Sequence, residues 1–215
     1  MKYIAAIAAA ALALSVPEAS ATDNDFEFWL NPSVKTDLDD DTALKLDTAQ
    51  RWRSAGEGRL DTYFGRLWLE QQVSGRLRVM GGAEYRINDG GADETRFLQQ
   101  MQSSHGILRT RFRLEQRFVE GADRMGLRLR PRLGINVPLD TRWDFKTDAE
   151  LFVTLRGNNE TSDTGVTGFR TQVGVGYELA DNISLSLAYL RNESIRDARP
   201  NRVGHAPIIG IGYVF

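Results

Sequence analysis

The chain has 215 residues, with 27 Lys and Arg, 29 Asp and Glu, 20 Gly and no Cys. This length predicts one domain or two small ones, and a net charge of -2 argues against a general nucleic-acid binder. The lack of Cys excludes disulfide scaffolds, thiolate zinc sites, Cys nucleophiles and Cys-anchored lipoproteins. No apolar run reaches the roughly 18–20 residues of a membrane-spanning helix.

The first 21 residues have the organisation of a cleaved export signal. Lys2 supplies a positive start, residues 3–16 are rich in Ala, Ile and Leu, and Ala19-Ser20-Ala21 fits an A-x-A cleavage site. The apolar stretch is too short to be a membrane anchor. We therefore expect a signal peptide over residues 1–21 and one β-barrel over residues 22–215. Export without Cys favours a bacterial location, and we expect the outer membrane.

The rest of the chain alternates between apolar and polar residues. Residues 76–88 are typical: Leu77, Val79, Ala83, Tyr85 and Ile87 alternate with Arg76, Arg78, Glu84 and Arg86. Successive side chains of a strand point to opposite faces, so this pattern predicts a strand with one apolar and one charged face. The runs are longer than the roughly 5–6 residues usual in globular proteins. They suit the roughly 9–11 residues of a tilted transmembrane strand.

Eleven such runs can be counted, and no helix is predicted after residue 21. They cover residues 26–37, 42–53, 60–73, 76–88, 96–103, 107–119, 124–137, 142–155, 168–179, 182–192 and 206–215. Short turns and longer loops alternate between them, as in outer-membrane barrels with short periplasmic turns. Single-chain bacterial barrels have even strand numbers, so the prediction is an all-β, antiparallel transmembrane barrel of 10–12 strands, with twelve preferred.

A soluble lipocalin-like barrel is the main alternative, because it alternates in the same way with its apolar face inside. Strand length and aromatic residues near both ends of the strands favour the membrane barrel. The last residues, Tyr213 and Phe215, keep the apolar register to an aromatic end. We expect these two residues to be read by the outer-membrane assembly machinery, and lipid to cover the apolar face.

Several segments in order also carry a family resemblance. They are Asp25-Phe-Glu-Phe-Trp-Leu30, Arg111-Phe-Arg-Leu-Glu-Gln-Arg-Phe118, Leu127-Arg-Leu-Arg-Pro-Arg-Leu133, Gly174-Val-Gly-Tyr177 and Tyr213-Val-Phe215. Through them the chain resembles the bacterial family labelled domain of unknown function 2490. The resemblance implies an outer-membrane β-barrel of unassigned biochemical role, and it brings no catalytic residues.

The charged face, expected to line the lumen, is rich in Arg. If the turn at residues 138–141 places Arg132 opposite Asp148 and Arg130 opposite Glu150, these residues form cross-strand ion pairs. The Arg residues from Arg109 to Arg117 would then lack enough acids on either neighbouring strand and need water, partners across the barrel or an anion. The predicted lumen cluster consists of Arg109, Arg111, Arg113, Arg117, Arg128, Arg130, Arg132, Asp144, Asp148 and Glu150.

Three uses of this lumen stay open: a structural ion-pair network, a narrow anion-preferring channel, or a site for small anionic solutes. The runner-up is a lipase- or protease-like enzyme acting at the external rim. Its only His candidates, His105 and His205, are expected at opposite ends of the barrel. An acidic segment, residues 37–41, could bind a divalent cation but is more simply a solvated turn. We therefore expect a non-enzymatic barrel with no catalytic residue, metal or cofactor.

Overall fold

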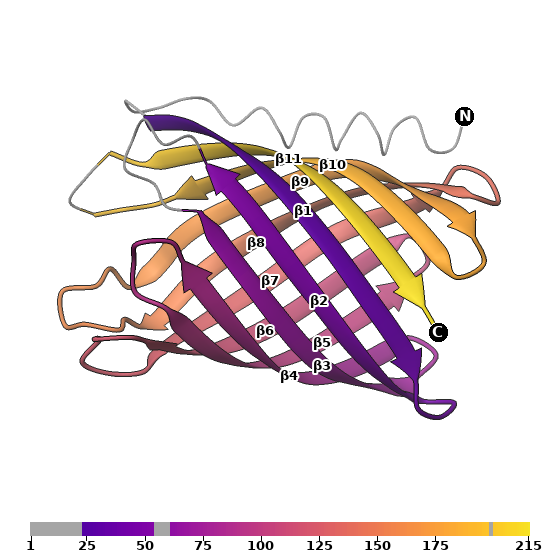
Figure 1. The fold of residues 1–215 in the computed structure, drawn as a ribbon, viewed down its shortest axis with the longest axis horizontal. Coiled ribbons are helices and arrows are strands. Elements are labelled where there is room, and N and C mark those ends of the chain that lie inside the picture. The colour runs from indigo at the N-terminus through magenta and orange to yellow at the C-terminus, as the bar shows by residue number, and fades with distance from the viewer. Residues whose placement is uncertain (1–22, 54–60, 198–199) are drawn as a thin grey trace.

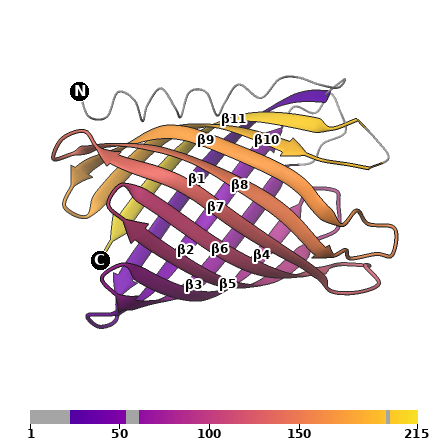
Figure 2. The same cartoon turned by 180° about the vertical axis from the view of Figure 1, so that it is seen from behind.

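The computed structural model describes residues 23–53, 61–197 and 200–215, and these residues form a closed β-barrel (Figure 1; Figure 2). The expected signal peptide lies outside them. Within the described part, no helix has the length and apolar character needed to cross a membrane. The strands are β1 (Asp23–Asp37), β2 (Thr42–Arg53), β3 (Thr62–Ser74), β4 (Leu77–Asn88), β5 (Glu94–His105), β6 (Leu108–Val119), β7 (Gly126–Pro138), β8 (Trp143–Arg156), β9 (Gly165–Ala180), β10 (Ile183–Ser194) and β11 (Arg202–Val214).

The described residues form eleven strands, so the range of 10–12 is confirmed and the preference for twelve is wrong. Each strand pairs antiparallel with its neighbours in sequence, but β1 and β11 close the barrel in parallel, from Asp23 opposite Arg202 to Lys35 opposite Val214. The parallel seam corrects the expectation of a wholly antiparallel barrel. Its cause is geometric, because an odd number of strands that alternate in direction ends with two neighbours pointing the same way.

The barrel has two unlike ends. The turn end carries the connections 38–41, 75–76, 106–107, 139–142 and 181–182, and the loop end carries those that follow β2, β4, β6, β8 and β10. In Figure 1 the loop end lies at the left and the turn end at the right. Strand β1 starts at the loop end and β11 finishes at the turn end.

Most strand boundaries differ from the sequence prediction by one to three residues, and the largest shift is at the start of β11. Strand β11 begins at Arg202, so the predicted loop of residues 193–205 is shorter and His205 lies inside a strand. Ladder pairing with β10 continues through His205 to Arg202. Strand β5 likewise extends over Glu94–His105 instead of residues 96–103.

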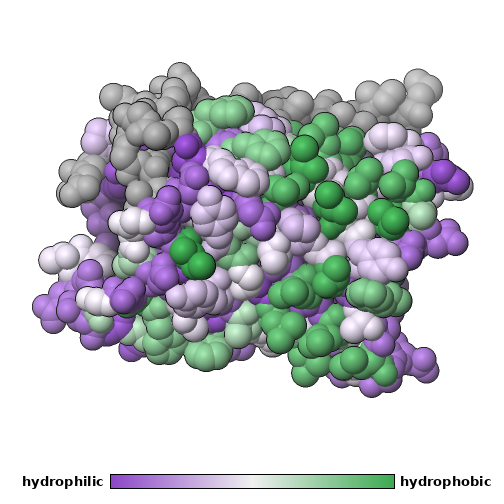
Figure 3. Space-filling model, in the orientation of Figure 1, coloured by the Kyte–Doolittle hydropathy of each residue, from purple (hydrophilic) through white to green (hydrophobic). Residues whose placement is uncertain are grey.

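The outer wall is apolar, as the alternation predicts. The side chains that alternate outward include Leu67 and Leu69 on β3, Phe112 on β6 and Leu187 on β10, each between 48% and 58% exposed. Figure 3 shows apolar side chains gathered toward the turn end of one face, with more polar ones toward the loop end. The apolar side chains therefore face outward and the charged side chains face the lumen, the reverse of a soluble barrel.

Two turns at the turn end are built in the same way. The carboxylate of Asp39 accepts hydrogen bonds from the amides of Asp41 and Thr42 at 2.9 and 2.7 Å. Asp140 accepts bonds from the amides of Arg142 and Trp143 at 2.7 and 2.8 Å. These amide bonds stabilise the charged carboxylates and lower the pKa of both Asp residues.

Candidate functional site: a cationic cavity in the lumen

An ion-pair network crosses the middle of the lumen, and two buried carboxylates are its hubs. Glu115 on β6 is 1% exposed and contacts Arg128 and Arg130, each with a closest N–O distance of 2.6 Å. Glu150 on β8 contacts Arg130 at 2.8 Å and also pairs with Arg111. Arg130 therefore joins the two hubs, and these contacts connect β6, β7 and β8 through side chains as well as backbone bonds.

The same network continues around the β2 to β5 side of the barrel. Glu84 is 2% exposed and lies 2.8 Å from Arg86 and 3.3 Å from both Arg66 and Arg96. Arg66 in turn contacts Asp47 of β2 at 2.7 Å. A charge in low dielectric needs an opposite charge and hydrogen bonds close by. These Arg and Glu side chains meet that need by bridging across the lumen.

The strand ladders place Glu94, Arg96, Glu115, Arg117 and Arg128 in the half of the barrel nearer the loops. Glu94 there binds Arg96 and also Arg117. The side chains of this half are long, charged and mutually bonded. The loop half of the lumen is consequently filled and cross-linked.

Several of the guanidinium groups pack against aromatic rings. The Cζ atom of Arg51 lies 3.8 Å from the ring centroid of Trp29, and Arg130 lies 4.5 Å from that of Phe152. Arg113 sits over Trp68 at 5.1 Å. Such cation–π contacts attract the guanidinium while leaving the edge that carries its N–H groups available to other partners.

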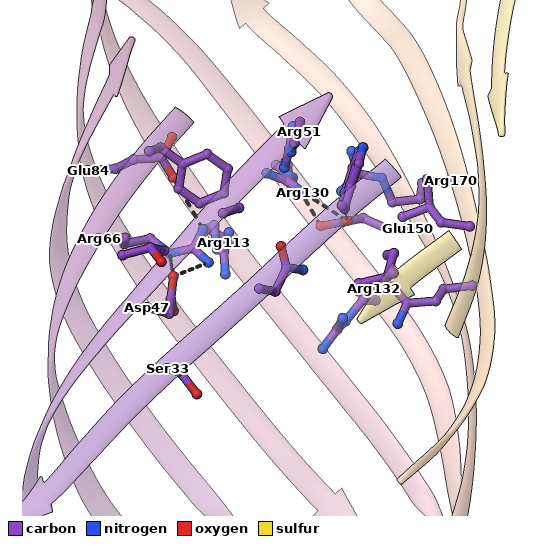
Figure 4. A pocket seen from close by; sticks show the side chains of 18 of the residues that line it. Ser33, Asp47, Arg51, Arg66, Glu84, Arg113, Arg130, Arg132, Glu150 and Arg170 are labelled. Carbon is purple, nitrogen blue, oxygen red and sulfur yellow. Dashed lines mark hydrogen bonds and ion pairs between the residues drawn. The ribbon is translucent and has the colours of Figure 1, made fainter. Parts of the chain in front are cut away.

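A cavity of about 260 Å³ lies in the centre of the lumen, beside this network. Figure 4 shows that side chains from strands on opposite sides of the barrel converge on it. Four acidic residues line it: Asp47, Glu84, Asp148 and Glu150. Nine basic residues line it: Lys45, Arg51, Arg66, Arg86, Arg111, Arg113, Arg130, Arg132 and Arg170. The walls carry a clear excess of positive charge, and this charge attracts anions.

The turn half of the lumen is built differently. A second space of about 230 Å³ adjoins the central cavity, because Asn31, Ser33, Gln172 and Ile208 line both. Its other lining residues are mostly small: Gly174, Gly210, Gly212, Ser184, Ser186 and Ala188 are among them. We call this space the vestibule. Its inward-facing positions carry few large side chains, so the lumen stays hollow here.

Glycine is needed at one vestibule position. A Cβ atom at Gly174 would lie 2.5 Å from the carbonyl oxygen of Leu187 and 2.8 Å from the Cα atom of Ala188. Such distances are far below van der Waals contact. Gly174 therefore allows β9 and β10 to approach closely in the barrel wall.

The structure places most of the predicted lumen cluster around the central cavity or the ion-pair network. Arg111, Arg113, Arg130, Arg132, Asp148 and Glu150 line the cavity, while Arg117 and Arg128 belong to the network. Two residues lie apart from both. Arg109 donates to the carbonyl oxygens of Gly106 and Leu108 at the turn end, and Asp144 pairs with Lys146 at 2.9 Å.

The predicted register of the β7–β8 hairpin is wrong by two residues. Arg132 lies opposite Glu150, and Gly134 opposite Asp148. The two predicted ion pairs form nevertheless, because Arg side chains reach diagonally: Arg132 contacts Asp148 at 3.4 Å and Arg130 contacts Glu150 at 2.8 Å. Arg111 finds its acid, Glu150, two strands away. Arg111 therefore has an acidic partner, although this partner is not on a neighbouring strand.

The cavity also contains residues that the sequence analysis did not single out. Arg51, Arg66 and Arg170 lie on β2, β3 and β9, where Arg is less frequent than on β6 and β7. The alternation of apolar and polar residues could have identified them, since each occupies an inward position of its strand. The sequence alone could not show that these three strands face β6 and β7 across one cavity.

The two His residues lie at opposite ends of the barrel, as expected. His105 ends β5 at the turn end, whereas His205 sits on the outer face of β11 near the loop end, with Nδ1 2.7 Å from the hydroxyl of Tyr189. Among residues 23–53, 61–197 and 200–215, no group of three His, Cys, Asp or Glu could hold a metal ion. The acidic segment at residues 37–41 forms the Asp39 turn described above.

The sequence profile of one family, described as Protein of unknown function (DUF2490), matches the chain over residues 26–203. The match covers most of the barrel, from β1 into β11. The chain belongs to this family. A search among curated proteins gave no match. For this DUF2490 barrel, the charged lumen is therefore the main guide to function.

Proposed function

We propose that this protein is a bacterial outer-membrane β-barrel, not an enzyme, whose cationic lumen admits small anions. One observation carries the proposal: nine basic and four acidic residues line the central cavity, inside a barrel whose outer wall is apolar. An apolar outer wall and a polar interior are what a bilayer requires of a barrel. A surplus of guanidinium groups in a confined space favours anions over cations.

The proposal includes a route to the membrane. Residues 1–21 direct export and are removed, and the assembly machinery reads the C-terminal strand through Tyr213 and Phe215. These two rings lie edge to face with centroids 4.8 Å apart, and Phe215 is 77% exposed at the turn end. Placing the turn end toward the periplasm follows the usual arrangement of short turns in outer-membrane barrels.

The lumen is proposed to be narrow, not a wide pore. The ion-pair network fills the loop half, so an anion that enters from the turn end meets cross-linked side chains beyond the central cavity. Barrels of 8 strands are filled by side chains and those of 16–18 leave a channel, so eleven strands fall between these limits. We therefore expect passage to be slow and restricted to small ions.

Membrane fractionation and ion flux test the proposal together. The protein should sediment with the outer membrane, and its folded form should migrate differently on a gel from the heated form. In liposomes it should release trapped chloride faster than trapped potassium, each measured with a suitable counter-ion carrier. A soluble periplasmic protein, or a faster release of potassium, would contradict the proposal.

A further inference from the structure

The central cavity contains guanidinium groups whose hydrogen-bonding capacity is used only in part, or not at all, among the residues that the structure describes. The Nε of Arg51 is buried and has no hydrogen-bond partner among the described residues, and its guanidinium forms no ion pair with them. Its main contact is the Trp29 ring. Arg111 pairs with Glu150 through one terminal nitrogen, while its Nε is buried and also lacks a partner in the described part of the chain.

Arg113 is also buried, with 5% of its surface exposed. Its Nε donates to the side-chain oxygen of Gln100 at 2.7 Å. Its closest carboxylate oxygen belongs to Glu115 and lies 4.0 Å away, which is too far for a hydrogen bond. Arg113 therefore brings a buried positive charge that its carboxylate neighbours compensate poorly.

Buried charge of this kind is costly without a counter-charge. The guanidinium group is planar, permanently charged and shaped to hold two oxygens of a phosphate or carboxylate at once. Several such groups pointing into one space, in excess of the acids, favour a compact ion with more than one negative charge. A tetrahedral phosphate group offers oxygens in several directions, and this geometry suits donors that arrive from different strands.

The size of the cavity limits the ligand. About 260 Å³ is below the roughly 300–1,000 Å³ of pockets that hold drug-sized molecules. The space is large enough for a small anion with some water. It is too small to enclose a nucleotide or a sugar chain.

The route to the cavity is one-sided. The vestibule reaches it from the turn end through residues that line both spaces, and its Gly and Ser residues offer little steric hindrance. Lys146 lines the vestibule as well as a third space of about 210 Å³ in the turn half. The loop half, by contrast, is occupied by the ion-pair network around Glu115.

We propose that the central cavity is a binding site for inorganic phosphate or a small phosphate monoester, entered from the turn end, with Arg51 and Arg113 as its principal ligands. This inference rests on the proposed anion-admitting lumen and names the ligand class. The inference adds a specific site that phosphate can saturate, whereas the proposed function requires only a lumen that favours anions over cations.

Calorimetric titration of the folded protein in detergent with inorganic phosphate tests the site. Wild-type protein should bind phosphate saturably, and Arg51→Gln and Arg113→Gln should each weaken binding at least about tenfold, as expected for loss of one charged hydrogen-bond donor. Arg124→Gln is the matched control, because Arg124 donates to the carbonyl oxygens of Gly157 and Asn159, lines none of the three lumen spaces and should leave binding unchanged. A second titration with glycerol phosphate distinguishes the free ion from a monoester.

Arg51→Lys covers the case in which Arg51→Gln fails to fold, since it keeps the charge and should bind phosphate more weakly than wild type. Absence of saturable binding to wild-type protein, or equal weakening by Arg124→Gln, would overturn the inference. Chloride flux without phosphate binding would refute the site and leave the proposed function standing. Phosphate binding without flux would support the site and refute passage.

Discussion

The carboxylate of Glu115 accepts a hydrogen bond from Arg130, with Oε1 2.6 Å from Nη1. Both side chains are buried, at 1% and 7% exposure, in the part of the lumen that faces the loops. Arg130 also binds Glu150. A change at either acid therefore disturbs contacts on three strands.

Removal of Glu115 should destabilise the barrel strongly. Glu115→Gln leaves Arg128 and Arg130 without one counter-charge, and removal of one partner from a buried pair costs about 3–5 kcal/mol. The free energy of unfolding can be measured in urea by the gel shift between folded and unfolded forms. Asp37→Asn is the control, since Asp37 pairs with Lys35 at an exposed site and should cost less than about 1 kcal/mol. Equal stabilities for the two variants would contradict a cross-linked lumen.

The paired glycines of β4 give a local test of the inward and outward faces. Gly82→Ala should destabilise by about 1–3 kcal/mol, because its Cβ would lie 2.5 Å from the Trp68 ring and 2.7 Å from the Leu67 carbonyl oxygen. Gly81→Ala points into open space and should be neutral or stabilising by about 0.4–1 kcal/mol. Urea unfolding of both variants measures the difference. The reverse order of stability would show that the two faces of β4 are assigned wrongly.

The two Asp turns should contribute a small acid sensitivity. The pKa of Asp39 and Asp140 is lowered in the folded protein by amide hydrogen bonds. Their stabilisation is therefore present above the ordinary Asp pKa of about 3.9 and is lost as the pH falls through the lowered folded value. The double variant Asp39→Asn and Asp140→Asn should lose less stability than wild type between neutral pH and about pH 3. An identical pH profile of stability for the double variant and wild type would show that the two turns do not contribute to the acid sensitivity.

The asymmetry of the lumen can be probed with thiol chemistry, because the natural chain has no Cys. Ser186→Cys places a thiol in the open vestibule, whereas Thr62→Cys places one at a position 1% exposed near the loop end. A sulfonate-bearing thiol reagent should label the first quickly and the second slowly. Mass spectrometry of each folded variant over time gives the rates. Faster labelling at residue 62 would mean that the hollow half of the lumen faces the loops.

Much of the fold was predictable because alternation records which face of a strand each residue occupies. The alternation of Val79, Tyr85 and Ile87 with Arg78, Glu84 and Arg86 suffices to orient β4. The register of β7 with β8 was not predictable from turn length alone. The carboxylate of Asp140 accepts hydrogen bonds from the amides of Arg142 and Trp143 and stabilises a turn longer than a minimal one. The longer turn places Pro138 opposite Asp144.

The candidate site was predictable in part for a related reason. Arg111 and Arg130 lie in dense runs of alternating Arg, which mark them as lumen residues. Arg51 lies on β2 outside such a run of alternating Arg, and its role depends on Trp29 beside it and on strands across the barrel. Such contacts depend on barrel closure, and the sequence did not define how the odd set of strands would close.

The most direct test of the central claim is the reversal potential of the reconstituted protein in a planar bilayer under a KCl gradient. The lumen as described predicts a small conductance whose reversal potential has the sign set by chloride, because positive charge dominates the cavity walls. Arg111→Glu together with Arg113→Glu should reduce or reverse that preference. A reversal potential set by potassium, or a preference unchanged by the two substitutions, would contradict the account.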